Sequence, residues 1–418
     1  MLLRSFYATV VVATSLYAND GFDDEFEDGE FADESIELVQ TTPVKKSDHR
    51  LNGSLTFSTS YNYKHHKPLN NTLNDFRGVS SAKLSSDIEY GYNIDDNYKL
   101  NSTLKLHKDF IYDLRDYNYK TTPEDYDSDI DLNELYIQGK LSDKTDITIG
   151  RQIVVWGKSD NIRITDTLNP LNNTTPGMVD IKDLRLGTAM TKVDHYYDIW
   201  SVSGIVIHEN RYSSIPKYGS DFALSSQISA NNISVDEPSN GIKNSGVAIN
   251  VQAQMQGEDI AFYVSNKYAD NTNYRSNMIG IAYNKVIDSF LLKTEAAYFD
   301  NYDSSTVDSK TDGLVGVEYS GISEGSISLE VANKDKNIQY ALRFTQSYLN
   351  QTLDFTALAY MHGKDMKEGG FTRLWLDYDI DDSFQTSFGV IYYQGGDKAN
   401  FEMIKDNDRV FASLKYSF

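Results

Sequence analysis

From Leu51 to the last residue, apolar and polar side chains alternate along the chain with a period of two. In one clear example, Val247, Ile249 and Val251 alternate with Asn250 and Gln252. This period is typical of β-strands with one face in apolar and the other in polar surroundings. The series shows no domain break and no repeat of fixed length, which argues against a soluble β-sandwich and a β-propeller. About 18 such segments can be placed, and they begin near residues 51, 80, 98, 130, 145, 184, 198, 246, 258, 276, 289, 312, 325, 339, 351, 371, 384 and 408.

The links between these segments alternate between short and long. The short links are 95–97, 142–144, 257–258, 350–351 and 381–382, and the long ones are 64–79, 111–129, 156–183, 210–245, 300–311, 362–370 and 395–407. Short periplasmic turns alternating with longer outer loops are typical of outer-membrane barrels. The sequence therefore predicts an all-β fold: a transmembrane antiparallel β-barrel of about 18 strands (range about 14–18) with both termini periplasmic. We expect this barrel to cover residues 49–418.

The first 48 residues do not follow the alternating pattern. Arg4, the apolar run 6–16 and the small residue Ala18 predict a secretory signal peptide over residues 1–18, with an uncleaved anchor as the alternative. Residues 19–48 include ten Asp or Glu and no Lys or Arg between Asp20 and Glu37. Such a stretch cannot bury a core, so we expect a disordered periplasmic segment. It is either a solvated spacer or a docking site for a periplasmic partner, with aromatic residues such as Phe22 making the contact.

The chain ends in a strand with a regular apolar face. Leu414, Tyr416 and Phe418 lie on one face, and Ser413 and Lys415 lie on the other. This pattern resembles the C-terminal assembly signal of bacterial outer-membrane barrels. The resemblance implies a cell outer-membrane location, contact with outer-membrane lipid and recognition by the barrel assembly machinery.

Between the fifth and sixth segments the alternation is interrupted by a stretch of mixed charge. Trp156 and Gly157 end the strand abruptly, and Pro170 and Pro176 stiffen the path. We expect the loop 156–184 to fold into the lumen, because charged residues at a constriction determine which ions and solutes pass. The predicted constriction residues are Arg151, Lys158, Asp160, Arg163, Asp166, Asp180, Lys182, Asp183 and Arg185. The predicted lumen-wall partners, on inward positions of later strands, are Lys293, Glu295, Arg343, Arg373 and Asp377. The alternative is a surface loop whose charges are solvated, and we expect the second long loop, 210–245, to be extracellular.

The same stretch resembles a known family. GRQ-x-x-x-WGKSD from Gly150, then NPL from Asn169 and PG-x-x-DI-x-DLR from Pro176, resemble a porin-like family of Gram-negative outer-membrane proteins classed as a domain of unknown function. That family is similar in outline to the alginate-export barrels. The resemblance is densest over residues 150–221. It implies a barrel, and for some members a role beside envelope exporters of hydrophobic or lipid-like compounds.

No catalytic or metal-binding motif is recognisable, so we predict neither an enzyme nor a metal or cofactor site. His65 and His66 are adjacent but lie in a polar loop, where exposure is the common outcome. The net charge of −22 argues against nucleic acid as a partner. The function favoured is a porin-like outer-membrane channel for a small or moderately sized solute. The alternatives are a transporter for hydrophobic or lipid-like compounds that works with an inner-membrane exporter, a barrel hydrolase at the rim, and an adhesin or anchor, which would need longer outer loops.

Overall fold

The computed structural model describes residues 48–67, 74–115, 124–217, 219–223, 236–303 and 308–418. The predicted signal peptide and nearly all of the predicted acidic segment lie outside these residues. The strands are β1 (His49–Asn62), β2 (Gly78–Asn93), β3 (Tyr98–Asp109), β4 (Ser128–Ser142), β5 (Thr145–Gln152), β6 (Thr188–Tyr197), β7 (Trp200–Ile207), β8 (Gly246–Met255), β9 (Glu258–Tyr268), β10 (Arg275–Ile287), β11 (Phe290–Asp303), β12 (Asp308–Ile322), β13 (Gly325–Lys334), β14 (Asn337–Tyr348), β15 (Leu353–His362), β16 (Gly370–Asp379), β17 (Phe384–Gln394) and β18 (Arg409–Ser417).

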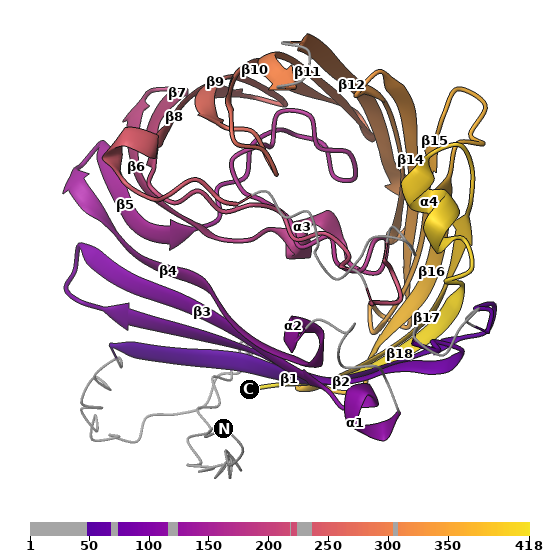
Figure 1. The fold of residues 1–418 in the computed structure, drawn as a ribbon. Helices are drawn as coiled ribbons and strands as arrows, with labels where there is room; N and C mark the ends of the chain where they lie inside the picture. The colour runs from indigo at the N-terminus through magenta and orange to yellow at the C-terminus, as the bar shows by residue number, and fades with distance from the viewer. Residues whose placement is uncertain (1–47, 68–73, 116–123, 218, 224–235, 304–307) are drawn as a thin grey trace, which may run out of the picture. The chain divides into compact units, whose positions relative to one another are not determined.

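These strands form one closed antiparallel sheet (Figure 1). Each strand pairs with its neighbours in the chain, and β1 pairs with β18 to close the ring, from Ser54 opposite Ser417 to Asn62 opposite Arg409. The predicted 18-stranded antiparallel barrel is therefore confirmed. Every observed strand begins within four residues of its predicted start.

The two faces of the sheet differ in chemistry. Large apolar side chains such as Phe57, Ile279 and Val315 are exposed on the outward face. The predicted C-terminal pattern joins this face, since Leu414 pairs with Phe57 and Tyr416 with Leu55, and Leu414, Tyr416 and Phe418 are all exposed. The alternation in sequence thus becomes an apolar exterior and a polar interior.

The helices are short: α1 (Ile111–Leu114), α2 (Glu124–Asp127), α3 (Ile181–Leu184), α4 (Ala399–Ile404) and a 3-10 turn, η1 (Ile242–Asn244). No helix in the described part of the chain is long and apolar enough to cross a membrane.

The links lie at two ends of the barrel. Two-residue turns join β4 to β5 and β6 to β7 at one end, which we call the short-turn end; β1 begins and β18 ends there as well. The link 153–187 between β5 and β6 and the link 208–245 between β7 and β8 leave the opposite, long-loop end. The first of these links, with α3, lies inside the ring of strands (Figure 1).

The hydrophobic core lies inside the ring, between the link 153–187 and the barrel wall. Trp156, Ile162 and Leu168 of the link are buried against strand residues such as Met278 and Leu314. Burying one large apolar side chain contributes about 1.5–3 kcal/mol, so these contacts strongly favour the inward position of the link.

Gly187, where the link re-enters β6, lies directly against β4. Its N–H donates to Asn133 Oδ1 at 3.0 Å, and a Cβ there would lie 1.7 Å from the Asn133 carbonyl oxygen. We expect Gly187→Ala to destabilise the barrel by about 1–3 kcal/mol, because the added atom forces the backbones apart. The detergent-solubilised barrel is incubated at increasing temperatures before electrophoresis. The temperature at which its compact, fast-migrating form disappears should be lower in the variant. Gly204→Ala is the control, since its Cβ would meet nothing within 4 Å; an equal shift in both variants would contradict the explanation.

Candidate functional site

The two ends of the inward link are tied together by Asn169. Its Oδ1 accepts from the Val154 N–H at 2.7 Å, and its Nδ2 donates to the carbonyl oxygens of Gln152 at 3.1 Å and Leu186 at 2.9 Å. Asn169 is buried, and one side chain therefore satisfies three backbone groups that would otherwise be unpaired. This bond set gives the link a closed neck at the point where it leaves the wall.

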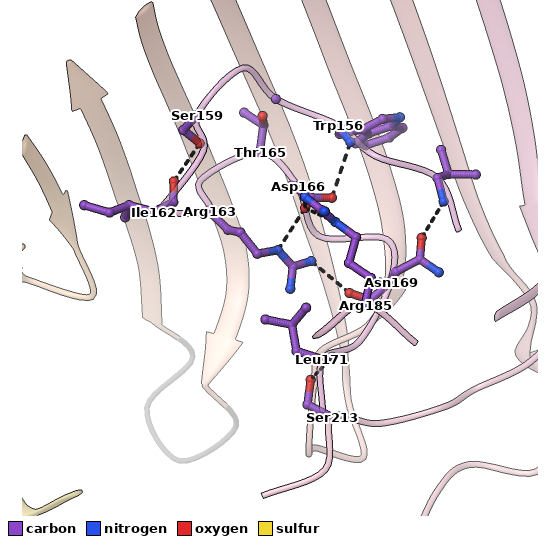
Figure 2. Close-up of polar contacts among 12 residues, drawn as sticks. Trp156, Ser159, Ile162, Arg163, Thr165, Asp166, Asn169, Leu171, Arg185 and Ser213 are labelled. Atoms are coloured by element: carbon purple, nitrogen blue, oxygen red, sulfur yellow. Dashed lines mark hydrogen bonds and ion pairs between the residues drawn. The ribbon is translucent and has the colours of Figure 1, made fainter. Parts of the chain in front are cut away.

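A buried ionic cluster lies just beyond this neck (Figure 2). Asp166 Oδ2 accepts from Arg185 Nε at 3.0 Å and Nη2 at 2.8 Å, and lies 3.0 Å from Arg163 Nε. Asp166 Oδ1 accepts from the Trp156 N–H at 3.3 Å, while Arg163 Nη2 donates to the Asn169 carbonyl at 2.8 Å. Burial lowers the pKa of Arg163, and the Asp166 carboxylate opposes that shift. These three predicted residues thus hold the link in shape, because a buried charge must be paired.

Two wall carboxylates bind the backbone of the link. Glu295 of β11 accepts from the N–H groups of Lys158 at 2.6 Å and Ser159 at 2.7 Å, and from both the N–H and the hydroxyl of Thr165. Glu330 of β13 accepts from the N–H groups of the three consecutive residues 160–162, at 2.7, 3.0 and 3.0 Å. Both carboxylates are buried. Hydrogen bonds to a charged acceptor contribute about 1.5–3 kcal/mol each, so this pair is the main polar anchor of the link.

The aromatic ring of Trp156 adds an apolar anchor next to Glu295. It stacks on Tyr263 of β9 with 4.8 Å between ring centroids, and the Tyr263 hydroxyl accepts from the Gly157 N–H at 3.2 Å. Gly157 has a φ of +82°, and a Cβ there would lie 2.8 Å from Glu295 Oε1. The Trp-Gly pair of the sequence motif is therefore explained by a tight turn against the wall.

The far part of the link is fixed to β14, β16 and β17. Asp180 pairs with Arg343 at 3.0 Å and Arg373 at 3.2 Å. The Arg373 guanidinium also donates to the Gly177 carbonyl at 3.2 Å, and the Tyr393 hydroxyl donates to the Pro176 carbonyl at 2.6 Å. Since β9 to β13 hold its near part and β14 to β17 its far part, the link is fastened to most of the wall opposite β5.

The other predicted residues differ in their contacts. Lys293 pairs with Asp160, whose carboxylate is still half exposed, and Lys158 lies 3.5 Å from Asp259. Arg151 pairs with Glu209 of the second long link. Lys182 and Asp183 are exposed on α3, and neither is in an ion pair with another described residue. Asp377, predicted as a wall partner, instead accepts from Trp375 Nε1 at 3.0 Å and Ser387 Oγ at 2.5 Å within the wall, and contacts no residue of the link.

Sequence reasoning missed Glu330 and Tyr263. Glu330 continues the inward series of Ser326 and Ser328, so a carboxylate at an inward position was the available signal. Its partners lie 168 to 170 residues away in the chain. No local pattern connects such distant residues.

Part of the second long link also lies inward, which the expected extracellular position of 210–245 did not anticipate. Asp221 pairs with Arg409 of β18 at 2.8 Å, and the Arg409 guanidinium lies over the buried Phe222 ring at 4.4 Å. The Leu171 N–H donates to Ser213 Oγ at 2.9 Å, which joins the two links (Figure 2). The buried Phe222 ring and the neighbouring ion pair of Asp221 with Arg409 hold this part of the link against the wall.

The described residues contain no group of three or more His, Cys, Asp or Glu side chains arranged to hold a metal ion.

Fold and site together define a closed, 18-stranded antiparallel barrel with a loop folded into its interior. The fold is similar to the crystal structure of Acinetobacter baumannii OccAB3, with a TM-score of 0.54 and 10% identity over 89% of this chain and 99% of that one. Mutants of the Rhodopseudomonas blastica porin are similar at TM-scores of 0.44 and 0.43 and identities of 15% and 14%, over 88% of this chain and 100% of theirs. At these identities the similarity concerns the fold alone.

The chain belongs to the family described as "Protein of unknown function (DUF1302)", whose model matches residues 48–326. This match confirms the resemblance carried by the GRQ-x-x-x-WG segment. No match is found among the curated proteins.

Removing the Glu330 carboxylate tests how the link is held. In Glu330→Ala, the N–H groups of residues 160–162 lose their acceptor, and we expect their hydrogen exchange to accelerate at least about tenfold. Exchange is measured by mass spectrometry on the folded, detergent-solubilised barrel. Glu258→Ala is the control, because that carboxylate binds Tyr283 and Lys285 and no residue of the link 153–187. Unchanged exchange at 160–162 in Glu330→Ala would contradict the anchor.

Proposed function

We propose that this protein is an outer-membrane channel, not an enzyme, and that it passes a small or moderately sized solute through a lumen constricted by the loop 156–184. The observation that carries the proposal is the attachment of this loop to the wall opposite its own strands, through Glu295, Glu330 and Asp180. A loop that is fixed to the wall at both its near and its far part narrows the interior of the barrel.

The chemistry of the two faces supports a membrane location. A closed sheet leaves no unpaired strand edge, and its outward face carries Phe57, Val315 and Leu414. Backbone groups in lipid must be satisfied within the protein, and a closed barrel does so. We further propose that the barrel assembly machinery recognises the strand that ends in Leu414, Tyr416 and Phe418. An acidic segment 19–48 that binds a periplasmic partner also remains a proposal.

The ion preference of such a channel would depend on the charges that are still exposed. Arg163 and Arg185 both pair with Asp166 in the buried cluster, so these charges are engaged within the link. Lys182 and Asp183 on α3 are exposed, and α3 lies inside the ring (Figure 1). They are therefore better candidates for contact with a passing ion than the buried charges.

The direct test is conductance of the purified barrel in planar lipid bilayers. We expect discrete conductance steps from the wild type and larger steps from Glu330→Ala, because the freed loop obstructs the lumen less. Glu258→Ala should leave the step size unchanged. A folded wild-type barrel that never conducts would contradict the channel.

Reversing one exposed charge tests the role of α3. Lys182→Glu is expected to shift the reversal potential in a salt gradient toward cations, since it replaces a positive by a negative charge in the lumen. Lys243→Glu, an equally exposed lysine in η1, is the matched control and should leave the potential in place. Equal shifts in both variants would show that α3 has no special position along the ion path.

One observation favours the transporter for hydrophobic compounds as a second candidate. The outward face holds a cavity of about 570 Å³ over β10 to β13, where Ala296 and Gly313 leave room between Ile281, Val315 and Val331. Such a hollow would suit an apolar molecule bound to the outward face of the wall. A barrel that stays silent in bilayers but takes up a fluorescent lipid analogue would favour this candidate.

A further inference from the structure

A second cavity, of about 280 Å³, lies between the inward link and the wall near the long-loop end. Its walls come from residues 163–173 of the link, residues 211–213 of the second link, and β9, β10, β11, β12 and β13. This volume is near the lower limit of typical ligand sites, about 300–1,000 Å³.

The lining of this cavity is rich in cations. Five basic side chains line it, against three acids; the bases are Arg163, Arg211, Lys267, Lys310 and Lys334, and the acids are Asp166, Asp270 and Asp312. This balance is opposite in sign to the net charge of −22 of the whole chain. A local excess of positive charge in a partly enclosed site favours an anion.

Three of the cations already have carboxylate partners. Arg163 and Arg185 share Asp166. Arg211 pairs with Asp131 at 2.9 Å, and Lys310 pairs with Asp312 at 2.7 Å. Asp166 and Asp312, two of the three acids of the lining, are therefore already paired, and little negative charge remains for the other two lysines.

The two remaining lysines have no such partner. Lys267 Nζ donates to the Tyr268 carbonyl at 3.2 Å, and neither Lys267 nor Lys334 is in an ion pair with any described residue. Asp270, the third acid, is exposed and its Oδ1 accepts from the Ser213 N–H at 2.8 Å. Lysine side chains without a carboxylate partner are costly to charge in a recess, and a bound anion would favour their charged form.

The uncharged lining has a polar part, with Ser265, Ser276 and Asn173 among its residues, and an apolar part. Met278 and Phe299 are buried on β10 and β11, and Ile164 and Leu171 of the link complete the apolar side. A site with ammonium groups beside an apolar wall matches a small molecule that carries a negative charge on an apolar body. A hydrated inorganic ion would gain nothing from the apolar side.

We propose that this cavity binds small organic carboxylates with an apolar body, with Lys267 and Lys334 supplying positive charge from opposite sides of the cavity wall. The site lies between the constricting link and the long-loop part of the wall, so a ligand held there would contact the link directly. The inference rests on the proposed channel function and adds the class of solute to it.

The test is titration calorimetry on the full-length barrel in detergent, with benzoate as the probe and benzamide as its neutral counterpart. We expect benzoate to bind, and benzamide to bind at least about tenfold more weakly, because it lacks the charge that the lysines meet. Inorganic phosphate should not displace benzoate. Equal binding of benzoate and benzamide, or displacement by phosphate at equal concentration, would overturn the proposal.

Variants locate the site. Lys334→Gln and Lys267→Gln should each weaken benzoate binding about tenfold or more, and Lys334→Arg should restore most of it. Lys243→Gln, outside the cavity, is the matched control. Unheated electrophoresis verifies that each variant is folded, and if one lysine variant fails to fold, the other decides. A loss equal to that of Lys243→Gln would overturn the assignment.

Conductance separates this inference from the channel itself. A wild-type barrel that is silent in bilayers contradicts the channel, whatever the calorimetry gives. A barrel that conducts but does not distinguish benzoate from benzamide overturns the carboxylate site alone. Support for both requires conductance steps that benzoate reduces in the wild type and reduces less in Lys334→Gln.

Discussion

The interior of this barrel depends on the bonds between two wall carboxylates and the backbone of one link. Glu295 and Glu330 are buried, and a buried carboxylate is costly unless it is hydrogen-bonded. The N–H groups of residues 158–162 lie next to these carboxylates, outside any strand or helix, and need acceptors. The carboxylates gain donors and the N–H groups gain acceptors, so neither is buried without a hydrogen bond. A link of this length therefore keeps one position although it contains little helix and no strand.

This arrangement divides the charges of the link by role. Asp166 pairs with Arg163 and Arg185 and stabilises the link from inside, whereas Lys182 and Asp183 remain exposed on α3. In the sequence the two groups look alike, because both are mixed charges within about forty positions of one motif. What separates them is burial, which depends on strands far away in the chain. Charge density marked the region correctly but could not rank its members.

A feature of this fold could be predicted from the sequence when the residues that form it lie close together in the chain. A strand in a two-faced barrel leaves a period of two in its own residues, so all 18 strands were found from the sequence. The anchor of the link joins residues 168 to 170 positions apart, and no local pattern records it. The second long link gives another example. Phe222 and Asp221 hold part of it against Arg409 of β18, which is 188 positions away from Asp221 in the chain.

Net charge is an equally poor guide to what such a lumen accepts. The chain is acidic overall, with a dense run of acids between Asp20 and Glu37, but charges act on an ion only within roughly a Debye length of about 8–10 Å. Inside the cavity between the link and β9 to β13, the nearest groups are predominantly basic, and Lys267 and Lys334 are not paired with carboxylates of the described residues. In the proposed channel, a solute in this cavity would meet the local field and not the average over the chain. The position of the inward link determines which charges the fold leaves unpaired at the cavity wall.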